Sequence, residues 1–400
     1  MDSPPIEPPH YERAFSIVCL SSQRWEAALP TNRQQVMIRA ARQGHRVLFV
    51  ETADFVAKHA LRGHGSSRPN RPTVQNVTVR KLVNVVPFSQ RYSVANEINF
   101  RIGGAEARRA AKDLPSPSVL WIYDPRGAAA IGAFGEDLVV YDCVDDYAEQ
   151  AATPRAQRFV SRLDKEVAER ADLVFATTER LRERHDRARG GVHLVPNAGD
   201  FDHFRPAAEP SFTDPEFAAL PRPILGFAGN IIESKVDLEL LDRVATTFPD
   251  GTLLLVGPVQ PELLARVHAL VEAHPNVRWT GLRPYETLPS AVAAFDVALI
   301  PYTTNEYTRS VFPLKVHEYL AAGKPVVASG VPSVAQLHPH VRLAESPEAF
   351  VAAIAEAIAA NGAGDRERIA VAAANTWEHR ANTLLRLIDA ELERAPARRD

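Results

Sequence analysis

Short apolar runs alternate with amphipathic segments along almost the whole chain. The apolar runs have the length of buried strands and lie at 15–20, 46–51, 119–123, 138–141, 173–177, 223–229, 252–257, 277–281, 296–301 and 325–329. Between them, apolar residues recur at helical spacing, as in the segment that Thr31 caps with Gln34 three residues later. Strands that alternate with helices predict an α/β fold with parallel sheets.

The length and one change in composition predict two domains. Four hundred residues are enough for two α/β domains, each with its own core. Residues 205–222 are rich in proline and acidic residues, which is typical of a linker. We therefore expect one Rossmann-like domain over 1–206, a second over 207–375, and a final helix over 376–400 that packs back on the first. The two domains are expected to face each other across a cleft.

Polar residues follow several of the predicted strands directly. Asp124 follows one apolar strand, and Asp145 and Asp146 follow the next. Ligands of parallel α/β sheets bind beyond the carboxyl ends of the strands. Each aspartate alone could equally serve as a turn residue or helix cap, but two clusters on neighbouring strand ends favour a polar binding cleft. The loop at 21–30 follows the first strand and is a further candidate, although it carries no dinucleotide or phosphate-loop fingerprint.

The segment 312–329 (FPLKVHEYLAAGKPVVAS) predicts a helix followed by a buried strand. Pro313 suits the first helical turn, where its missing N–H is not needed. The N–H groups at 311–314 would then be free at the positive end of the helix dipole, which favours a bound phosphate. Lys315 and Glu318 project from one face, where the cation suits a phosphate and the carboxylate a ribose or sugar hydroxyl. The alternative is an ordinary surface ion pair.

Composition and charge narrow the choice of function. A formal net charge of −3 over the whole chain gives no sign of nucleic-acid binding. Cys19 and Cys143 both lie in strand-like runs, which argues against a disulfide scaffold or a zinc site and favours a reducing compartment. No apolar run is long enough to span a bilayer, and the first residues lack the order of a signal peptide. We expect a cytoplasmic protein, with peripheral contact at the inner face of the membrane left open.

The second half carries short motifs in a fixed order. They are 229–235 (GNIIESK), 256–257 (VG), 276–281 (NVRWTG), 296–301 (DVALIP) and 318–327 (EYLAAGKPVV), preceded by Pro196, Asn197, Asp200 and Phe204. This set resembles the nucleotide-sugar-binding domain of the retaining GT-B glycosyltransferases of family 4, and the resemblance covers nearly the whole chain. With W-x-x-x-L early in the chain, Y-D-x-x-D-D and P-L-K-x-x-E-Y-L, the sequence is most similar to the cell-wall and teichuronic-acid-type branch.

The resemblance implies transfer of a sugar from a nucleoside diphosphate sugar to a hydroxyl acceptor, with retention at the anomeric carbon. It implies a donor site made of Gly229, Asn230, Lys235, Gly257, Asn305, Ser310, Val311, Phe312, Pro313, Leu314, Lys315 and Glu318. It implies catalytic roles for Asp145, Asp146 and Lys235, and an acceptor side in the first domain with Arg24, Trp25, Asp124 and Arg126. The expected acceptor is a sugar or lipid-linked molecule of cell-surface glycan or glycolipid synthesis. No metal is expected, and the D-x-D at 200–202 is interpreted as a structural turn.

One site position departs from the family pattern on the donor-sugar side. Ser310 stands eight residues before Glu318, where the family has the glutamate that holds the donor sugar. Asn305 or Glu306 would have to take over that role, so the identity of the sugar stays open. The nucleotide role of Glu318 does not depend on this replacement.

A second departure concerns the phosphates. Asn230 stands where the family has an arginine, and Lys315 is the candidate replacement. Three other interpretations remain: a non-catalytic paralogue that only binds the nucleotide, a sugar-nucleotide epimerase of the same architecture, and a two-domain solute-binding protein, which would need a signal sequence. Release of nucleoside diphosphate with and without an acceptor would separate a transferase from the first two.

Overall fold

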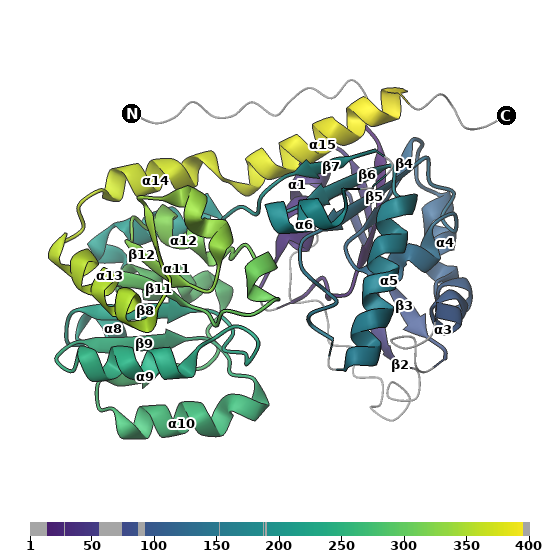
Figure 1. Cartoon of the computed structure of the whole chain (residues 1–400). Coiled ribbons are helices and arrows are strands. Elements are labelled where there is room, and N and C mark those ends of the chain that lie inside the picture. The colour runs from purple at the N-terminus through teal and green to yellow at the C-terminus, as the bar shows by residue number, and fades with distance from the viewer. Residues whose placement is uncertain are drawn as a thin grey trace. The chain divides into compact units, whose positions relative to one another are not determined.

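The structure is a computed structural model that describes residues 14–27, 29–55, 74–86, 93–151, 153–186, 188 and 190–394. Residues 1–13, whose sequence bears on targeting, lie outside the described residues. Contacts divide the chain into two compact units (Figure 1): unit 1 is Met1–Pro196 with Glu378–Asp400, and unit 2 is Asn197–Trp377. None of the described helices combines the length and the apolar character that a membrane span requires.

Unit 1 is built on a seven-stranded parallel sheet. Its strands are β1 (Ser16–Ser21), β2 (Arg46–Phe55), β3 (Val77–Asn84), β4 (Ser118–Ile122), β5 (Leu138–Cys143), β6 (Leu173–Ala176) and β7 (Val192–Leu194), in the order β3-β2-β1-β4-β5-β6-β7. The order changes direction between β1 and β4, and in such sheets ligands bind beyond the carboxyl ends of the strands at this point. This edge is therefore where unit 1 offers a binding site.

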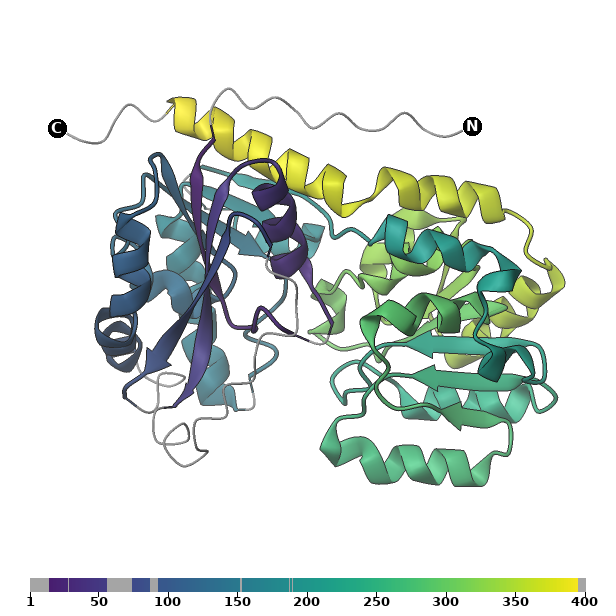
Figure 2. The same ribbon diagram turned by 180° about the vertical axis from the view of Figure 1, so that it is seen from behind.

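Helices cover the sheet of unit 1. They are α1 (Asn32–Arg42), α3 (Ser93–Ile98), α4 (Ala105–Lys112), α5 (Pro154–Arg170), α6 (Glu179–Arg184) and α15 (Trp377–Arg394). Figure 2 shows α1, in dark purple, lying along the strands. Every residue of β1 and β5 is buried, since helices on both faces leave no side of a central strand exposed.

The final helix α15 is fixed to unit 1 by polar contacts. Arg380 donates to both carboxylate oxygens of Asp142, at 2.9 and 3.2 Å, and both side chains are buried. Nearer the start of the helix, Glu378 accepts a hydrogen bond from Nε of Arg39 at 2.6 Å. A buried ion pair of this kind is costly to break, because the charge that remains cannot be solvated.

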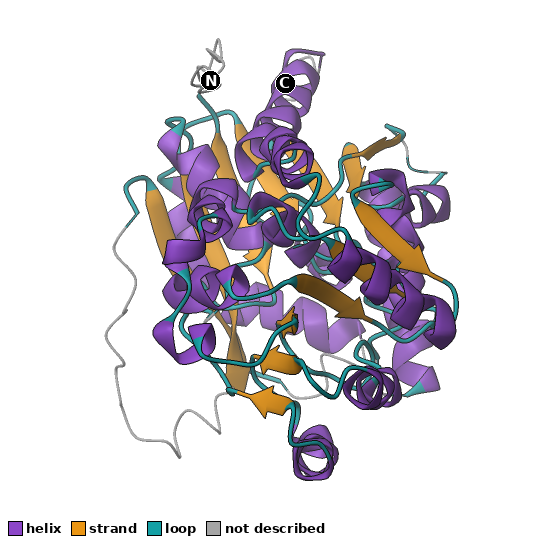
Figure 3. Ribbon diagram, turned by 90° about the vertical axis from the view of Figure 1, so that its left-hand side faces the viewer, coloured by secondary structure: helices purple, strands orange, loops and turns teal. Residues whose placement is uncertain are grey.

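Unit 2 contains a second parallel sheet, of six strands. Its strands are β8 (Ile224–Ala228), β9 (Thr252–Val256), β10 (Val277–Trp279), β11 (Val297–Pro301), β12 (Val326–Ser329) and β13 (Val341–Ala344), in the order β10-β9-β8-β11-β12-β13. Its helices are α7 (Phe201–Phe204), α8 (Pro215–Ala218), α9 (Leu238–Thr247), α10 (Leu264–Ala273), α11 (Leu288–Ala293), α12 (Lys315–Ala321), α13 (Pro347–Ala359) and α14 (Asp365–Ala374). Figure 3 shows the strands, in orange, flanked by the helices, in purple. The strand order reverses between β8 and β11, which marks the binding edge of this sheet.

The predicted fold class is confirmed: the chain is α/β, with two Rossmann-like parallel sheets. The segment 205–222, which we expected to be a linker, is instead packed on unit 2. Ala207 and Phe217 are buried in the core of unit 2, because this proline-rich stretch carries apolar side chains that pack under α11. The division between the units falls after Pro196, ten residues before the expected boundary.

Candidate functional site

Two glycines form the floor of the candidate donor site at the carboxyl edge of unit 2's sheet. Gly229 follows β8 and Gly257 follows β9, with φ angles of 148° and 138° that side chains rarely allow. A Cβ on Gly229 would lie 2.3 Å from Nζ of Lys315, and one on Gly257 would lie 2.2 Å from the carbonyl oxygen of Gly229. Only glycine permits this close approach of backbone and lysine.

Lys315 is the first residue of α12 and reaches back over this floor. Its Nζ lies 4.0 Å from the ring centroid of Phe227 and donates a hydrogen bond to Oη of Tyr302 at 3.3 Å. The pKa of Lys315 is lowered to about 7: burial is the largest cause, the positive charge of Lys235 adds to it, and Glu318 opposes both. Burial destabilises the charged form of such a lysine, and an anionic ligand bound beside it would stabilise that form again.

Lys235 and Glu318 complete an ionisable group around the same floor. The ammonium of Lys235 lies 5.3 Å from the ring centroid of Tyr307. Burial raises the pKa of Glu318 to about 7, against the charge of Lys315 and with a smaller contribution from Asp200. The sequence predicted these three residues in one site, and in the structure the charges of Lys235 and Glu318 both act on Lys315.

The loop before α12 is more tightly built than the sequence suggested. The side-chain amide of Asn305 donates to the carbonyl of Ser234 at 2.9 Å, and its oxygen accepts from the amide of Thr308 at 2.8 Å. Glu306 pairs with Arg309 at 3.3 Å, with both side chains about half exposed. Asn305 therefore holds the loop together.

Ser310 is completely buried and its amide donates to the carbonyl of Tyr307 at 3.0 Å. The carbonyl of Phe312 accepts from the side-chain amide of Asn197 at 3.0 Å, which secures the start of the helix. Neither position presents a carboxylate, and Glu306, which does carry one in this loop, pairs with Arg309.

The expected row of free amides at 311–314 is only partly correct. The helix begins at Lys315, with Pro313 and Leu314 in the turn before it. The amide of Val311 donates to the carbonyl of Thr308 at 3.1 Å, and Pro313 has no N–H. The positive charge of the site thus comes mainly from the lysines. Asn230, which follows the glycine floor, is exposed.

In unit 1, Asp124 and Arg126 bind each other. Asp124 accepts hydrogen bonds from the amide of Arg126 at 3.0 Å and from its Nε at 2.7 Å. Burial acts to raise the pKa of Asp124, but the charge and hydrogen bonds of Arg126 outweigh it and lower the pKa. Asp124 is therefore an ionised partner of Arg126, at the end of β4.

Asp145 and Asp146 follow β5 and differ in their surroundings. Asp146 is buried, pairs with Arg184 and accepts from the amide of Glu149 at 3.3 Å. Asp145 is half-buried, and its carbonyl accepts from the amide of Tyr147 at 3.2 Å. Asp146 thus anchors the segment, while Asp145 is the more accessible of the two.

Sequence reasoning missed Arg33. It lies in the first turn of α1, is 4% exposed, donates to Oη of Tyr147 and stands 5.3 Å above the ring of Tyr123. Burial acts to lower the pKa of Arg33, but Tyr147, Asp145, Tyr123 and Asp124 raise it. The helix dipole destabilises a cation in the first turn of a helix. The position of Arg33 in that turn was therefore the feature of the sequence that could have indicated this residue.

Arg24 and Trp25 occupy different positions. Trp25 is buried and packs edge-on against Phe49, with ring centroids 4.9 Å apart, and its amide donates to Glu51 at 2.7 Å. Trp25 is thus a packing residue, whereas Arg24 is exposed in the same loop.

The D-x-D is part of a turn in unit 2. Asp200 precedes α7 and accepts a hydrogen bond from Oη of Tyr285 at 3.1 Å, while Asp202 is exposed. The described residues around it do not form a group of metal ligands.

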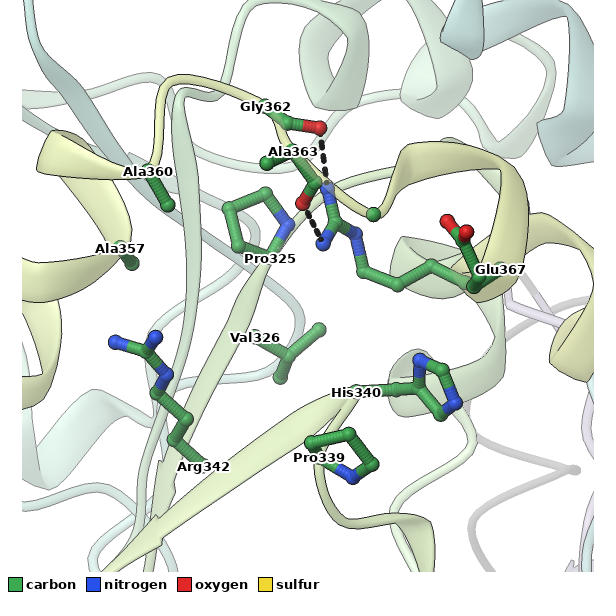
Figure 4. Close-up of a pocket in the computed structure, with 12 residues that line it drawn as sticks. Pro325, Val326, Pro339, His340, Arg342, Ala357, Ala360, Gly362, Ala363 and Glu367 are labelled. Atoms are coloured by element: carbon green, nitrogen blue, oxygen red, sulfur yellow. Dashed lines mark hydrogen bonds between the residues drawn. The ribbon is translucent and has the colours of Figure 1, made fainter.

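A pocket of about 260 Å³ lies at the opposite edge of unit 2's sheet, where β12 and β13 begin (Figure 4). Arg368 fills one side and donates to the carbonyls of Gly362 and Ala363 at 3.0 and 2.8 Å. The guanidinium of Arg368 is thus already hydrogen-bonded to the backbone. None of the predicted site residues lines the pocket.

A comparison with known families finds a match within the second unit. The family model described as "Glycosyl transferases group 1" matches residues 222–360. Residues 222–360 are thus similar to the group 1 glycosyltransferases. The matched region contains the glycine floor, Lys235, Lys315 and Glu318.

Two curated relatives that match part of the chain are glycosyltransferases by name. The chain is 28% identical over 260 residues to TuaH of Bacillus subtilis, named for teichuronic acid biosynthesis, with 61% of this chain and 64% of TuaH covered. It is 29% identical over 199 residues to the 2-deoxystreptamine glucosyltransferase of Streptomyces kanamyceticus, with 46% and 50% covered. The matches thus span less than two thirds of these relatives.

Solved structures share the fold over nearly the full length. The sucrose-phosphate synthase of Thermosynechococcus elongatus superposes with a TM-score of 0.71 at 19% identity, covering 96% of this chain and 100% of that one. HepE of Anabaena in complex with UDP-glucose gives a TM-score of 0.68 at 18% identity, covering 94% and 99%. The GT-B fold class expected from the sequence is confirmed by these similarities.

Proposed function

We propose that the chain is a retaining glycosyltransferase that moves a sugar from a nucleoside diphosphate sugar to a hydroxyl acceptor of cell-surface glycan or glycolipid synthesis. The observation that carries the proposal is the grouping of Lys235, Lys315 and Glu318 around the glycine floor inside the matched region. The complex of HepE with UDP-glucose and the name of TuaH support the donor and acceptor classes.

Transfer breaks the bond between the anomeric carbon and the phosphate oxygen of the donor. The leaving nucleoside diphosphate gains negative charge while the sugar gains positive character. Lys235 and Lys315 stabilise the leaving diphosphate, and Glu318 binds the ribose hydroxyls. Because the lysines supply the positive charge, we expect no gain in rate from added Mg²⁺ or Mn²⁺.

The acceptor hydroxyl is assigned to the edge of unit 1. Asp145 orients or deprotonates this hydroxyl, and Asp146, held by Arg184, fixes the segment. Arg33 and the Asp124–Arg126 pair lie at the ends of the neighbouring elements and shape this edge. A lipid-linked acceptor would bring the protein to the inner face of the membrane.

The test is release of nucleoside diphosphate from a panel of UDP- and GDP-sugars, with and without acceptor sugars. Acceptor-dependent release is expected, with the anomeric configuration of the product read by NMR. Release without any acceptor would indicate an epimerase or hydrolase. Binding of UDP or GDP without release would favour the non-catalytic alternative. The observation behind this alternative is that Ser310 replaces the family glutamate.

A further inference from the structure

A buried cluster in unit 1 has no role in the proposed transfer. The thiol of Cys143, a carboxylate oxygen of Asp164 and a ring nitrogen of His185 all lie within 4.8 Å of one another. Cys143 ends β5, Asp164 lies in α5 and His185 follows α6, so three separate elements bring them together. We propose that these side chains bind a divalent transition metal and that this metal is zinc.

All three residues are deeply buried, at 1%, 6% and 4% exposure for Cys143, Asp164 and His185. A divalent cation would displace the thiol proton to solvent and be neutralised by the thiolate and the carboxylate together.

His185 offers a ring nitrogen for coordination. Its Nε2 lies 3.4 Å from Oδ2 of Asp164, yet within the described part of the chain this atom makes no hydrogen bond. A polar atom at such depth without a hydrogen bond destabilises the folded protein. Coordination of a metal would satisfy it, as neutral imidazole is a common zinc ligand.

The geometry requires only small shifts. Ligand atoms around tetrahedral zinc are about 3.5 Å apart, given zinc bonds of roughly 2.0–2.3 Å. The other oxygen of Asp164 accepts a hydrogen bond from Oη of Tyr141, which holds the carboxylate in place as outer partners of metal ligands do. Three protein ligands leave the fourth position to water.

A metal at this place would have a structural role. Cys143 lies two residues before Asp145, and Arg184, which pairs with Asp146, directly precedes His185. The metal would therefore tie α5 and α6 to the segment that carries both aspartates. The alternative is a hydrogen-bonded network of the core that holds no metal.

The first test is the metal content of the full chain, purified from zinc-supplemented medium without chelator. Wild type is expected to hold about one zinc per chain, as one three-ligand site predicts. Cys19→Ser is the matched control, since Cys19 is also buried but lies in β1, outside the cluster. Zinc should be retained in Cys19→Ser and lost in Cys143→Ser and His185→Gln.

The second test is decided first on the wild type, so it does not depend on whether a variant folds. Cobalt(II) added to metal-free wild type should produce a thiolate-to-cobalt charge-transfer band in the near ultraviolet, which Cys19→Ser preserves and Cys143→Ser removes. Wild type that contains no zinc and gives no such band would overturn the proposal, and the cluster would then be part of the core. Neither readout depends on transfer activity.

Discussion

Lys315 predicts how donor affinity depends on pH. Its pKa in the free protein is about 7, because of burial and the charge of Lys235. A bound diphosphate favours the charged ammonium and raises this pKa again, so binding takes up a proton. Affinity should therefore be greatest below pH 7 and fall as pH rises through 7, where the free protein loses the proton that the complex needs.

The size of the effect follows from that pKa. If only the protonated lysine binds, the competent fraction falls from roughly nine tenths at pH 6 to about 3% at pH 8.5. The dissociation constant should thus rise about 30-fold, or about 2 kcal/mol. Glu318 also ionises near pH 7, and its negative charge would weaken phosphate binding in the same direction.

The assay is isothermal titration calorimetry with UDP-glucose, or the donor sugar found active, between pH 6 and 8.5. A nucleotide sugar is chosen because its phosphates do not titrate in this range. Measurements in buffers of different ionisation enthalpy should reveal the uptake of a proton near pH 8. Lys315→Arg should keep only the part of the pH dependence that Glu318 contributes, because a guanidinium stays charged.

Two results would refute this reasoning. An unchanged dissociation constant across the pH range, with no proton uptake, would show that Lys315 is charged before the ligand arrives or does not contact it. A wild-type pH profile that persists in Lys315→Arg would assign the titration to another group.

Three further predictions concern the donor site and stability. Lys235→Ala should lower the transfer rate by orders of magnitude without a change in melting temperature, and near-wild-type turnover would remove Lys235 from the mechanism. Gly229→Ala should weaken donor binding by at least about tenfold because its Cβ enters the space of the Lys315 ammonium, whereas Gly281→Ala, which has open space, should bind normally in the same calorimetric titration. Arg380→Ala should cost about 3–5 kcal/mol of unfolding free energy in urea denaturation, because Asp142 is left buried and unpaired; a loss below 1 kcal/mol would show that the pair is not needed.

The sequence predicted the fold class through local patterns. Apolar runs bounded by turn residues fix buried parallel strands, and a capping box at Thr31 fixes the start of a helix, because each depends on residues close in the chain. Lys315 and Glu318 were predictable as neighbours for the same reason, since helical spacing alone places them on one face. Two features followed only partly from local patterns: α12 begins two residues later than Pro313 suggested, and the 205–222 segment packs on unit 2.

What local patterns determined, then, is the alternation of elements, the glycine positions at the strand ends and the ionisable residues of one helix face. Only the tertiary structure decided which charges are buried together. Arg33 lies far in sequence from Tyr147, and Cys143, Asp164 and His185 come from three elements that only the folded sheet brings together. The physical reason is that burial and charge coupling depend on distance in space, so the pKa of Lys315 and the partners of Asp142 appear only when the sheets and their covering helices are in place.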